Sequence, residues 1–327
     1  MSPEQTVAAV GELGLLRLVD ERIGRAPEGE VWGGDDTAVV SAPGPRLLLT
    51  TDLLVAGIDF ELAWASGEDI GWKAAVANVS DVAAMGGRPT HALLTVGVAP
   101  TAPLALFEGL LEGLVEAMAS YGVAVVGGDI SEAGELSVGV SLMGREGEQV
   151  VLRSGARACD VVCVTGALGG AVGGLEALRR GLPRSGAAAR LIGRQLRPEA
   201  RLVAGEALAA AGARAMIDVS DGVALDLARL CDASGTGCTI RSGELPIDPD
   251  LRALEGFDPV AAALTGGEDF ELLCALPADR VGMAGRALRS ADVDLTPIGE
   301  MTAGPRLIDG RPLETWTERA WQHLRTS

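Results

Sequence analysis

The stretch Gly71–Gly87, GWKAAVANVSDVAAMGG, most constrains what this chain can fold into, because it is rich in very small residues: Ala74, Ala75, Ala77, Ala83 and Ala84. Side chains this small let a helix approach its neighbours closely on several sides, so we predict a largely buried helix over 66–85. Asn78 and Asp81 are three residues apart and share one face of that helix. A buried acid is costly unless it is paired or binds a metal. The alternative is a partly exposed Asp81 that hydrogen-bonds a loop.

The chain has 327 residues, of which 48% are apolar and only 3% aromatic, so its core must be built mainly from Ala, Val and Leu. That length suits two domains. Apolar strands and amphipathic helices alternate, and the first half is expected to run β-β-α-β-α-β-β. A polar, turn-rich segment near 145–155 suggests a boundary between domains at 1–148 and 149–327. We therefore expect a mixed α/β protein.

The net charge of −18 argues against nucleic acid or an anionic membrane as a main partner, since both require basic surfaces. All five cysteines fall in the second half and form no CxxC pair, which predicts small buried side chains in a reducing compartment. The first residues are expected to start a helix and not a signal peptide. No uncharged apolar run approaches the ~18–20 residues of a membrane span. A soluble, cytoplasmic protein is expected.

Acids recur beside glycines or at the ends of apolar strands: Asp35, Asp36, Asp52, Asp129, Asp218, Asp221, Glu268 and Asp269. Strand ends are where ligands bind in open α/β sheets. So many carboxylates would repel one another unless divalent cations lay among them, and Mg²⁺ prefers carboxylates together with water and substrate phosphates. The hydroxyls of Thr50, Thr51 and Ser220 suit the same oxygen-rich coordination. The set as a whole predicts a site with several metal ions.

Each acid also has an ordinary structural role open to it. Asp221 is a candidate helix N-cap, while Asp129 and Asp52 are candidate turn residues. The glycine-rich GALGGAVGG resembles a dinucleotide-binding turn only weakly, and no P-loop is present. The two histidines lack companions at zinc-ligand spacing. Lys73 is expected to extend its ammonium group from the helix to water.

Seven motifs in order give the chain a specific resemblance: GDDTAVV, TTDLLVAGIDF, WKAAVANVSDVAAMGG, VVGGDIS, LRSGA, IDVSDG and GGEDFELL. Together they resemble the thiamine-monophosphate kinase family, within the superfamily of aminoimidazole-ribonucleotide synthetase-like ATP-binding proteins. The resemblance covers nearly the whole chain. It implies an N-terminal domain that binds ATP and Mg²⁺ and forms a homodimer through its sheet, a C-terminal α/β domain, and an active site between them. It also implies ATP-dependent phosphorylation of thiamine monophosphate to thiamine diphosphate.

Carried over motif by motif, the resemblance implies Mg²⁺ ligands at Asp36, Thr50, Thr51, Asp52, Asp81, Asp129, Asp218 and Asp221. Among these, Asp52, Asp81, Asp129 and Asp218 would act in catalysis through the bound metal. ATP contacts are implied at Gly128, Asp129, Arg153 and Ser220. Thiamine phosphate contacts are implied at Asp59, Glu268 and a C-terminal aromatic, for which Trp321 matches loosely. Position 59 departs from the pattern, because relatives often have His there.

Related enzymes remain as alternatives. Selenophosphate synthetases use a reactive Cys or selenocysteine near the N-terminus, whereas no Cys precedes Cys159. The hydrogenase-maturation relatives end in a functional Cys, and this chain ends LRTS. Aminoimidazole-ribonucleotide synthetase stays open on architecture, although Glu268 and Trp321 favour the thiamine kinase. A binding protein without catalysis is the alternative from a different class.

Overall fold

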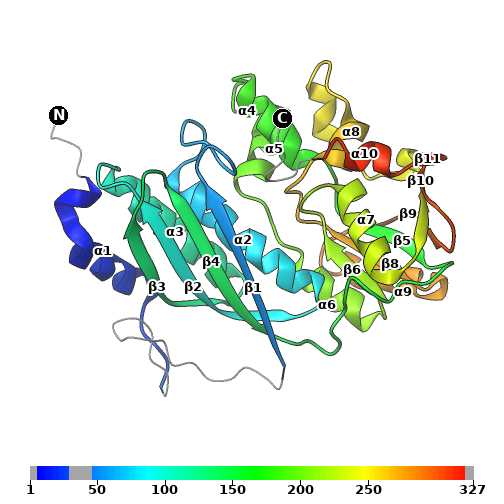
Figure 1. The fold of residues 1–327 in the computed structure, drawn as a ribbon, viewed down its shortest axis with the longest axis horizontal. Coiled ribbons are helices and arrows are strands. Elements are labelled where there is room, and N and C mark those ends of the chain that lie inside the picture. Colours follow the sequence, from blue (N-terminus) through cyan, green and yellow to red (C-terminus); the bar gives the residue numbers. More distant parts are fainter. Residues whose placement is uncertain (1–5, 29–45, 321–327) are drawn as a thin grey trace. The chain divides into compact units, whose positions relative to one another are not determined.

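The computed structural model describes residues 6–28 and 46–320 (Figure 1). The chain divides into two compact units. The first comprises residues up to Val79 together with Arg88–Arg145, and the second comprises Ser80–Gly87 together with Glu146 onward. The eight residues Ser80–Gly87 include the end of a helix that begins in the first unit. The acid Asp81 therefore packs with the second unit.

The first unit is a four-stranded sheet in the order β1-β4-β2-β3 with helices on one face (Figure 1). Its elements are α1 (Val7–Ile23), β1 (Leu47–Val55), α2 (Gly67–Ala84), β2 (Arg88–Val98), α3 (Leu104–Ser120), β3 (Ala124–Glu132) and β4 (Ser137–Arg145). Strand β4 is antiparallel to both β1 and β2, whereas β3 is parallel to β2.

Small residues bring α2 and α3 into backbone contact, as the composition of α2 predicts. A Cβ atom at Gly71 would lie 2.0 Å from the carbonyl oxygen of Leu110 on α3, and one at Gly67 would lie 2.3 Å from that of Leu106. No side chain larger than hydrogen fits at either position without moving the helices. The alanines Ala74 and Ala75 are fully buried. The prediction of a mostly buried helix is confirmed.

The second unit is a seven-stranded mixed sheet in the order β11-β10-β7-β9-β5-β8-β6. Its strands are β5 (Val161–Thr165), β6 (Ala215–Asp218), β7 (Gly237–Ile240), β8 (Leu272–Leu276), β9 (Leu295–Thr302), β10 (Arg306–Ile308) and β11 (Arg311–Pro312). Its helices are α4 (Gly170–Arg179), α5 (Gly186–Leu196), α6 (Leu202–Ala210), α7 (Val223–Ser234), α8 (Pro259–Thr265), α9 (Ala278–Arg289) and α10 (Glu314–Thr317). Two 3₁₀ turns, η1 (Ser242–Glu244) and η2 (Pro249–Ala253), complete it.

Both faces of this second sheet are covered, which explains its continuous apolar strands. Along β5, Val162 and Val164 join a core with α7 and α8, while Cys163 between them joins a core with α6 and α9. All five residues of β8 are buried. The cores consist largely of Ala, Val and Leu, as the shortage of aromatics predicts.

The mixed α/β fold class is confirmed, with local differences. Asp129 does not lie at a strand end: β3 continues through the Gly-Gly-Asp motif to Glu132, because parallel pairing with β2 extends to Val98. Cys159 is exposed, which corrects the expectation that all five thiols are buried. The first strand of the expected β-β-α-β-α-β-β order, near 37–40, lies outside the described residues. Within 6–28 and 46–320, no helix is both long and apolar enough to cross a membrane.

Candidate active site

The side chains of strand β1 alternate between the two faces of the first sheet. Thr50 and Asp52 are half-buried and lie on the same face of the sheet as the buried Leu54, whereas Thr51 is exposed on the opposite face. The Thr51 hydroxyl donates to the carbonyl oxygen of Val140 at 3.0 Å and lies 3.2 Å from Ser141 Oγ. Of the three adjacent candidate ligands, only Thr50 and Asp52 therefore share a face.

Asp59 forms the turn that follows β1. Its Oδ2 accepts a hydrogen bond of 2.8 Å from the Val55 backbone N–H, and its carbonyl oxygen accepts one of 3.1 Å from Lys73 Nζ. Lys73 is 4% exposed, so its ammonium group is buried and does not extend to water as expected. The carbonyl contact compensates part of the cost of burying that charge.

Gly128 and Asp129 lie on β3, at the opposite edge of the sheet from β1. The ladder runs from Asp52 through Val140 and Leu94 to Gly128. Three interstrand spacings separate the edges, or about 14 Å. Asp129 is exposed, and its position within a paired strand excludes the turn role that the sequence left open.

In the second unit, Asp81 at the end of α2 and Asp218 at the end of β6 form a pair of acids. Asp218 is 3% exposed. Burial, together with the charge of Asp81, raises the pKa of Asp218 to about 7, although the Ser80 hydroxyl and the charge of Arg153 act in the opposite direction. Two carboxylates whose charges interact, one of them buried, favour a bound cation.

These residues also fit the magnesium ions that the family resemblance implies. Asn78 Oδ1, one helical turn before Asp81, is buried and accepts no hydrogen bond from any residue that the structure describes. The donor set is entirely oxygen, which is what Mg²⁺ prefers. No three His, Cys, Asp or Glu side chains converge as a metal-binding group within the described ranges. Asp36, a further expected ligand, lies outside those ranges.

The turn Ser220–Asp221–Gly222 is held by an acid that the sequence analysis did not single out. Asp226 on α7 is fully buried, and its Oδ2 accepts from the backbone N–H groups of Ser220 and Asp221 at 3.1 and 3.0 Å. Burial raises the pKa of Asp226 to about 7, in opposition to its bond with the Asp221 N–H. Arg229 Nη1 bridges Asp226 Oδ1 at 2.8 Å and Asp221 Oδ2 at 2.5 Å.

Asp221 is thus not an N-cap: Gly222 occupies that position in α7, without a side-chain capping bond. The only sequence signal for Asp226 was an acid inside the apolar run VALDLARL. Such an acid must find hydrogen-bond donors when the helix is buried, and here the donors are the main chain of the adjacent motif.

The GGED motif lies directly against this turn. The Glu268 backbone N–H donates to the Ser220 carbonyl oxygen at 2.9 Å, and a Cβ atom at Gly267 would lie 2.4 Å from that same oxygen. Only glycine permits this approach. The expected ATP contact Ser220 and the expected substrate contact Glu268 are therefore neighbours within one unit.

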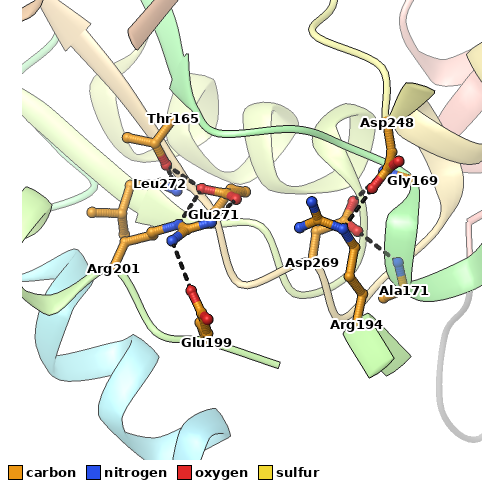
Figure 2. Close-up of polar contacts among 10 residues, drawn as sticks. All are labelled: Thr165, Gly169, Ala171, Arg194, Glu199, Arg201, Asp248, Asp269, Glu271 and Leu272. Carbon is orange, nitrogen blue, oxygen red and sulfur yellow. Dashed lines mark hydrogen bonds and ion pairs between the residues drawn. The ribbon is translucent and has the colours of Figure 1, made fainter. Parts of the chain in front are cut away.

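Asp269 and Glu271, on either side of Phe270, are structural (Figure 2). Asp269 accepts from the Gly169 and Ala171 N–H groups at 2.6 and 3.0 Å, at the start of α4. An acid of the chain itself thus occupies the helix start in GALGGAVGG, where a dinucleotide phosphate would otherwise bind. Glu271 is 1% exposed and binds Arg201 through both carboxylate oxygens, at 2.8 and 2.7 Å.

Trp321 lies outside the described residues, and Arg153 is exposed, close enough to Asp218 to affect its pKa. Of the expected site residues that the structure describes, the second unit contains Asp81, Arg153, Asp218, Ser220, Asp221 and Glu268, and the first contains Thr50, Thr51, Asp52, Asp59, Gly128 and Asp129. Three residues were missed from the sequence: Ser80, Asp226 and Gln195. Each is an ordinary polar residue whose partner is distant in the chain or is backbone.

Two family models match the chain: the N-terminal domain of AIR synthase related proteins over residues 34–145, and the C-terminal domain over 158–309. The chain is 36% identical over 327 residues to thiamine-monophosphate kinase of Mycobacterium tuberculosis, covering 97% of this chain and 92% of the relative. It is 35% identical over 320 residues to that of Aquifex aeolicus, covering 96% and 98%.

Comparison with solved structures indicates the same family as the sequence comparison. A crystal structure of thiamine-monophosphate kinase from Stenotrophomonas maltophilia K279a is similar with a TM-score of 0.82 and 33% identity, over 91% of this chain and 96% of that one. A structure described as AaThiL complexed with AMPPCP and TMP gives a TM-score of 0.76 at 35% identity, over 95% and 97%. Hydrogenase maturation protein HypE, at 21% identity, shares the fold. The chain belongs to the thiamine-monophosphate kinase family of AIR synthase-related proteins.

Proposed function

We propose that this protein is a kinase that transfers the γ-phosphoryl group of ATP to the phosphate of thiamine monophosphate, forming thiamine diphosphate. The observation that carries the proposal is the pair Asp81 and Asp218, in which the buried Asp218 carboxyl interacts with the charge of Asp81, two residues before Ser220. Family membership over nearly the full chain supports the substrates. So does the solved structure of a relative described as complexed with AMPPCP and TMP.

Charge is the main obstacle to this reaction, because ATP and a phosphomonoester together bring about six negative charges near neutral pH. Mg²⁺ bound by these carboxylates would supply the charge neutralisation that lets the two phosphate groups approach. The proposed ligands are Asp36, Thr50, Thr51, Asp52, Asp81, Asp129, Asp218 and Asp221. Among them, Asp218 has its Oδ2 oriented by the Ser80 hydroxyl.

The acceptor oxygen of thiamine monophosphate is already ionised and needs no general base. We infer a direct in-line transfer in which this oxygen attacks the γ-phosphorus and ADP leaves, without a covalent enzyme intermediate. Gly128, Asp129, Arg153 and Ser220 are the proposed ATP contacts. The organic part of the acceptor is assigned to Asp59, Glu268 and Trp321. The Asp59 carboxylate also closes the turn after β1, so its role is partly structural.

A homodimer formed through the first unit is part of the proposal. The sheet face opposite α2 and α3 carries four exposed leucines: Leu47 at 47%, Leu49 at 73%, Leu53 at 63% and Leu93 at 45%. Large apolar side chains exposed together on one face of a protein mark interaction sites. A second copy of the chain is the proposed occupant. A cytoplasmic location is also proposed, since the cysteines are free thiols.

An assay that couples ADP release to a chromogenic reaction, with direct detection of thiamine diphosphate, tests the function. Product should form only when ATP, Mg²⁺ and thiamine monophosphate are all present. Omitting Mg²⁺ or replacing thiamine monophosphate with thiamine should abolish product. If thiamine diphosphate does not form but formylglycinamidine ribonucleotide is converted, the synthetase alternative replaces this one. Binding of ATP and Mg²⁺ without turnover of either acceptor would indicate a binding protein.

A further inference from the structure

Four of the five cysteines are brought together as two buried pairs in the second unit. Cys163 on β5 is the direct antiparallel partner of Cys274 on β8. Cys231 lies in the last turn of α7, and Cys238 follows it on β7 after a short connection. All four thiols are free, so each pair is a dithiol that could be oxidised to a disulfide.

The turn between Cys231 and Cys238 reverses the chain so that the two side chains meet. Gly235 follows α7 in the left-handed conformation, with a φ of +64°, and the Thr236 N–H donates to the Cys231 carbonyl oxygen at 3.1 Å. The chain then enters β7 at Gly237. Both cysteines belong to one core cluster, and the Cys238 S–H donates a hydrogen bond to Cys231 Sγ. The two sulfur atoms are therefore direct neighbours.

A cation lies beside this pair of thiols. Arg306 on β10 is the parallel-strand partner of Cys238, and its Nη2 donates to Asp232 Oδ1 at 2.5 Å. The hydrogen bond from Cys238 lowers the pKa of the Cys231 thiol, and the charge of Arg306 acts in the same direction, although burial and the charge of Asp232 oppose them. A thiol that has a cation and a hydrogen-bond donor beside it is favoured as a nucleophilic thiolate.

The residues that contact the two cysteines also line a cavity of about 460 Å³. Thr236, Arg306 and Leu307 are among the lining residues. Thr236 bonds the Cys231 main chain, Arg306 pairs with Cys238 in the sheet, and the Leu307 N–H donates to Cys238 Sγ. Both thiols are fully buried, behind the residues that form the cavity wall. Only a reagent of a few atoms is small enough to reach them from the cavity.

The other pair, Cys163 and Cys274, has different surroundings. The two residues lie opposite each other within the sheet, in the core that α6 and α9 cover. Burial raises the pKa of the Cys163 thiol to about 12. Burial also raises the pKa of Cys274, and the charge of Cys163 adds to the effect. Buried thiols with raised pKa values are inert, so this pair is a comparison inside the same protein.

We propose that Cys231 and Cys238 form a modification site, a dithiol that hydrogen peroxide oxidises reversibly to an intrachain disulfide. The Cys231 thiolate attacks one peroxide oxygen, the O–O bond breaks, hydroxide leaves, and a sulfenic acid forms on Cys231. The Cys238 sulfur then attacks Cys231 Sγ, which forms the S–S bond and releases a second hydroxide. The two thiol protons convert both hydroxides to water. The sulfurs lose two electrons and the peroxide gains them, and the disulfide joins the last turn of α7 to the start of β7.

The test exposes the folded full-length protein to hydrogen peroxide, removes the peroxide, unfolds the chain and alkylates every thiol that remains free. Trypsin, which cleaves after Arg229 and Arg241, yields one peptide, 230–241, that contains both Cys231 and Cys238. In the oxidised protein this peptide should lose both alkylation sites and be two hydrogens lighter by mass spectrometry. Dithiothreitol, added before alkylation, should restore both sites. The thiols of the β5–β8 pair should stay alkylated throughout.

Two variants distinguish the proposed pair from ordinary thiol oxidation. In Cys238→Ala the sulfenic acid on Cys231 has no partner, so dimedone, a reagent for sulfenic acids, should label position 231. Cys163→Ala, at an equally buried thiol outside the pair, is the matched control and should form the 230–241 disulfide as wild type does. Full alkylation of peptide 230–241 after a treatment that oxidises the exposed Cys159 would overturn the proposal. Equal oxidation of Cys163 and Cys274 would also overturn it. Peptide mapping of wild type decides the question even if a variant does not fold.

Discussion

Ser80 Oγ donates a hydrogen bond of 2.7 Å to Asp218 Oδ2, and both residues are buried. The two are 138 positions apart. Ser80 directly precedes Asp81, so the residue that orients one acid is the neighbour of the other. The end of α2 thus supplies both a second carboxylate and the donor that stabilises the charged form of Asp218.

Replacing Ser80 with Ala should therefore weaken both the fold and metal binding. The buried Asp218 oxygen loses a donor, at a cost of about 1–3 kcal/mol in the free energy of unfolding. Urea denaturation measures the first effect. The rise of Tm with added Mg²⁺ measures the second, and it should be smaller in the variant. Ser290→Ala removes an exposed serine hydroxyl that bonds only its own helix end, and should match wild type in both measurements.

Asp52→Asn should abolish turnover while leaving the fold intact. The substitution keeps the shape of the side chain but removes the charge that a divalent cation requires. Losses of 10- to 100-fold are typical for residues that only support a metal ligand, so we expect at least about a 100-fold fall in kcat. The thermal unfolding curve should be unchanged. Near-normal turnover in this variant would remove Asp52 from the site.

Asp269 predicts a pH dependence of stability. Burial raises its pKa from the ordinary 3.8 to about 7, even though two N–H groups donate to it. A raised carboxyl pKa means that the folded chain binds the proton more tightly than the unfolded chain. The stabilisation of the fold by the protonated Asp269 carboxyl is therefore fully present below about pH 4, and it is lost as the pH rises to about 7.

Asp269→Asn removes this titration. Wild type should accordingly lose stability relative to the variant between about pH 4 and 7, by on the order of 1–4 kcal/mol, with a constant difference above that range. Urea denaturation at a series of pH values measures this. Asp279→Asn, on the exposed side of α9, serves as the control. Its free energy of unfolding should change with pH in the same way as that of wild type. A difference in the free energy of unfolding between wild type and Asp269→Asn that does not change with pH would contradict the prediction.

Two glycines in helices predict opposite effects of alanine. A Cβ atom at Gly205 on α6 would lie 2.1 Å from the carbonyl oxygen of Ala83, so Gly205→Ala must push α6 away from the end of α2. Overpacking of this kind costs about 1–3 kcal/mol. At Gly193 on α5 nothing lies within 4 Å, and Gly193→Ala should stabilise by about 0.5–1 kcal/mol. Denaturation midpoints compare the two.

Leu49→Glu should convert the proposed dimer to a monomer. The side chain is 73% exposed in the single chain, and a charge placed there would be buried against the second copy. Sedimentation velocity reports the change in mass. Val203→Glu, at a 65% exposed position on α6, is the control and should leave the mass unchanged. A wild-type protein that sediments as a monomer at micromolar concentration would contradict the dimer itself.

What the sequence determined by itself was local. The density of alanine in Gly71–Gly87 predicted a buried helix, and close contacts at Gly67 and Gly71 bear this out. The order of apolar runs predicted the mixed α/β class, and the motif set indicated the family. These features depend on periodicity and on residues adjacent in the chain. The boundaries of β3 and the exposure of Cys159 were missed, because pairing and packing with distant segments decide both.

Only the tertiary structure decided which partner each acid has. Asp269 meets the start of α4 about a hundred residues away, and Glu268 meets Gln195 at a separation of 73. Asp221 is bound by Arg229 instead of capping α7, since Asp226 already holds the turn. A carboxylate has the same local signature whether it pairs with an arginine, an amide or a metal. Long-range packing selects among these, because it determines which donors lie within hydrogen-bond distance of a buried oxygen.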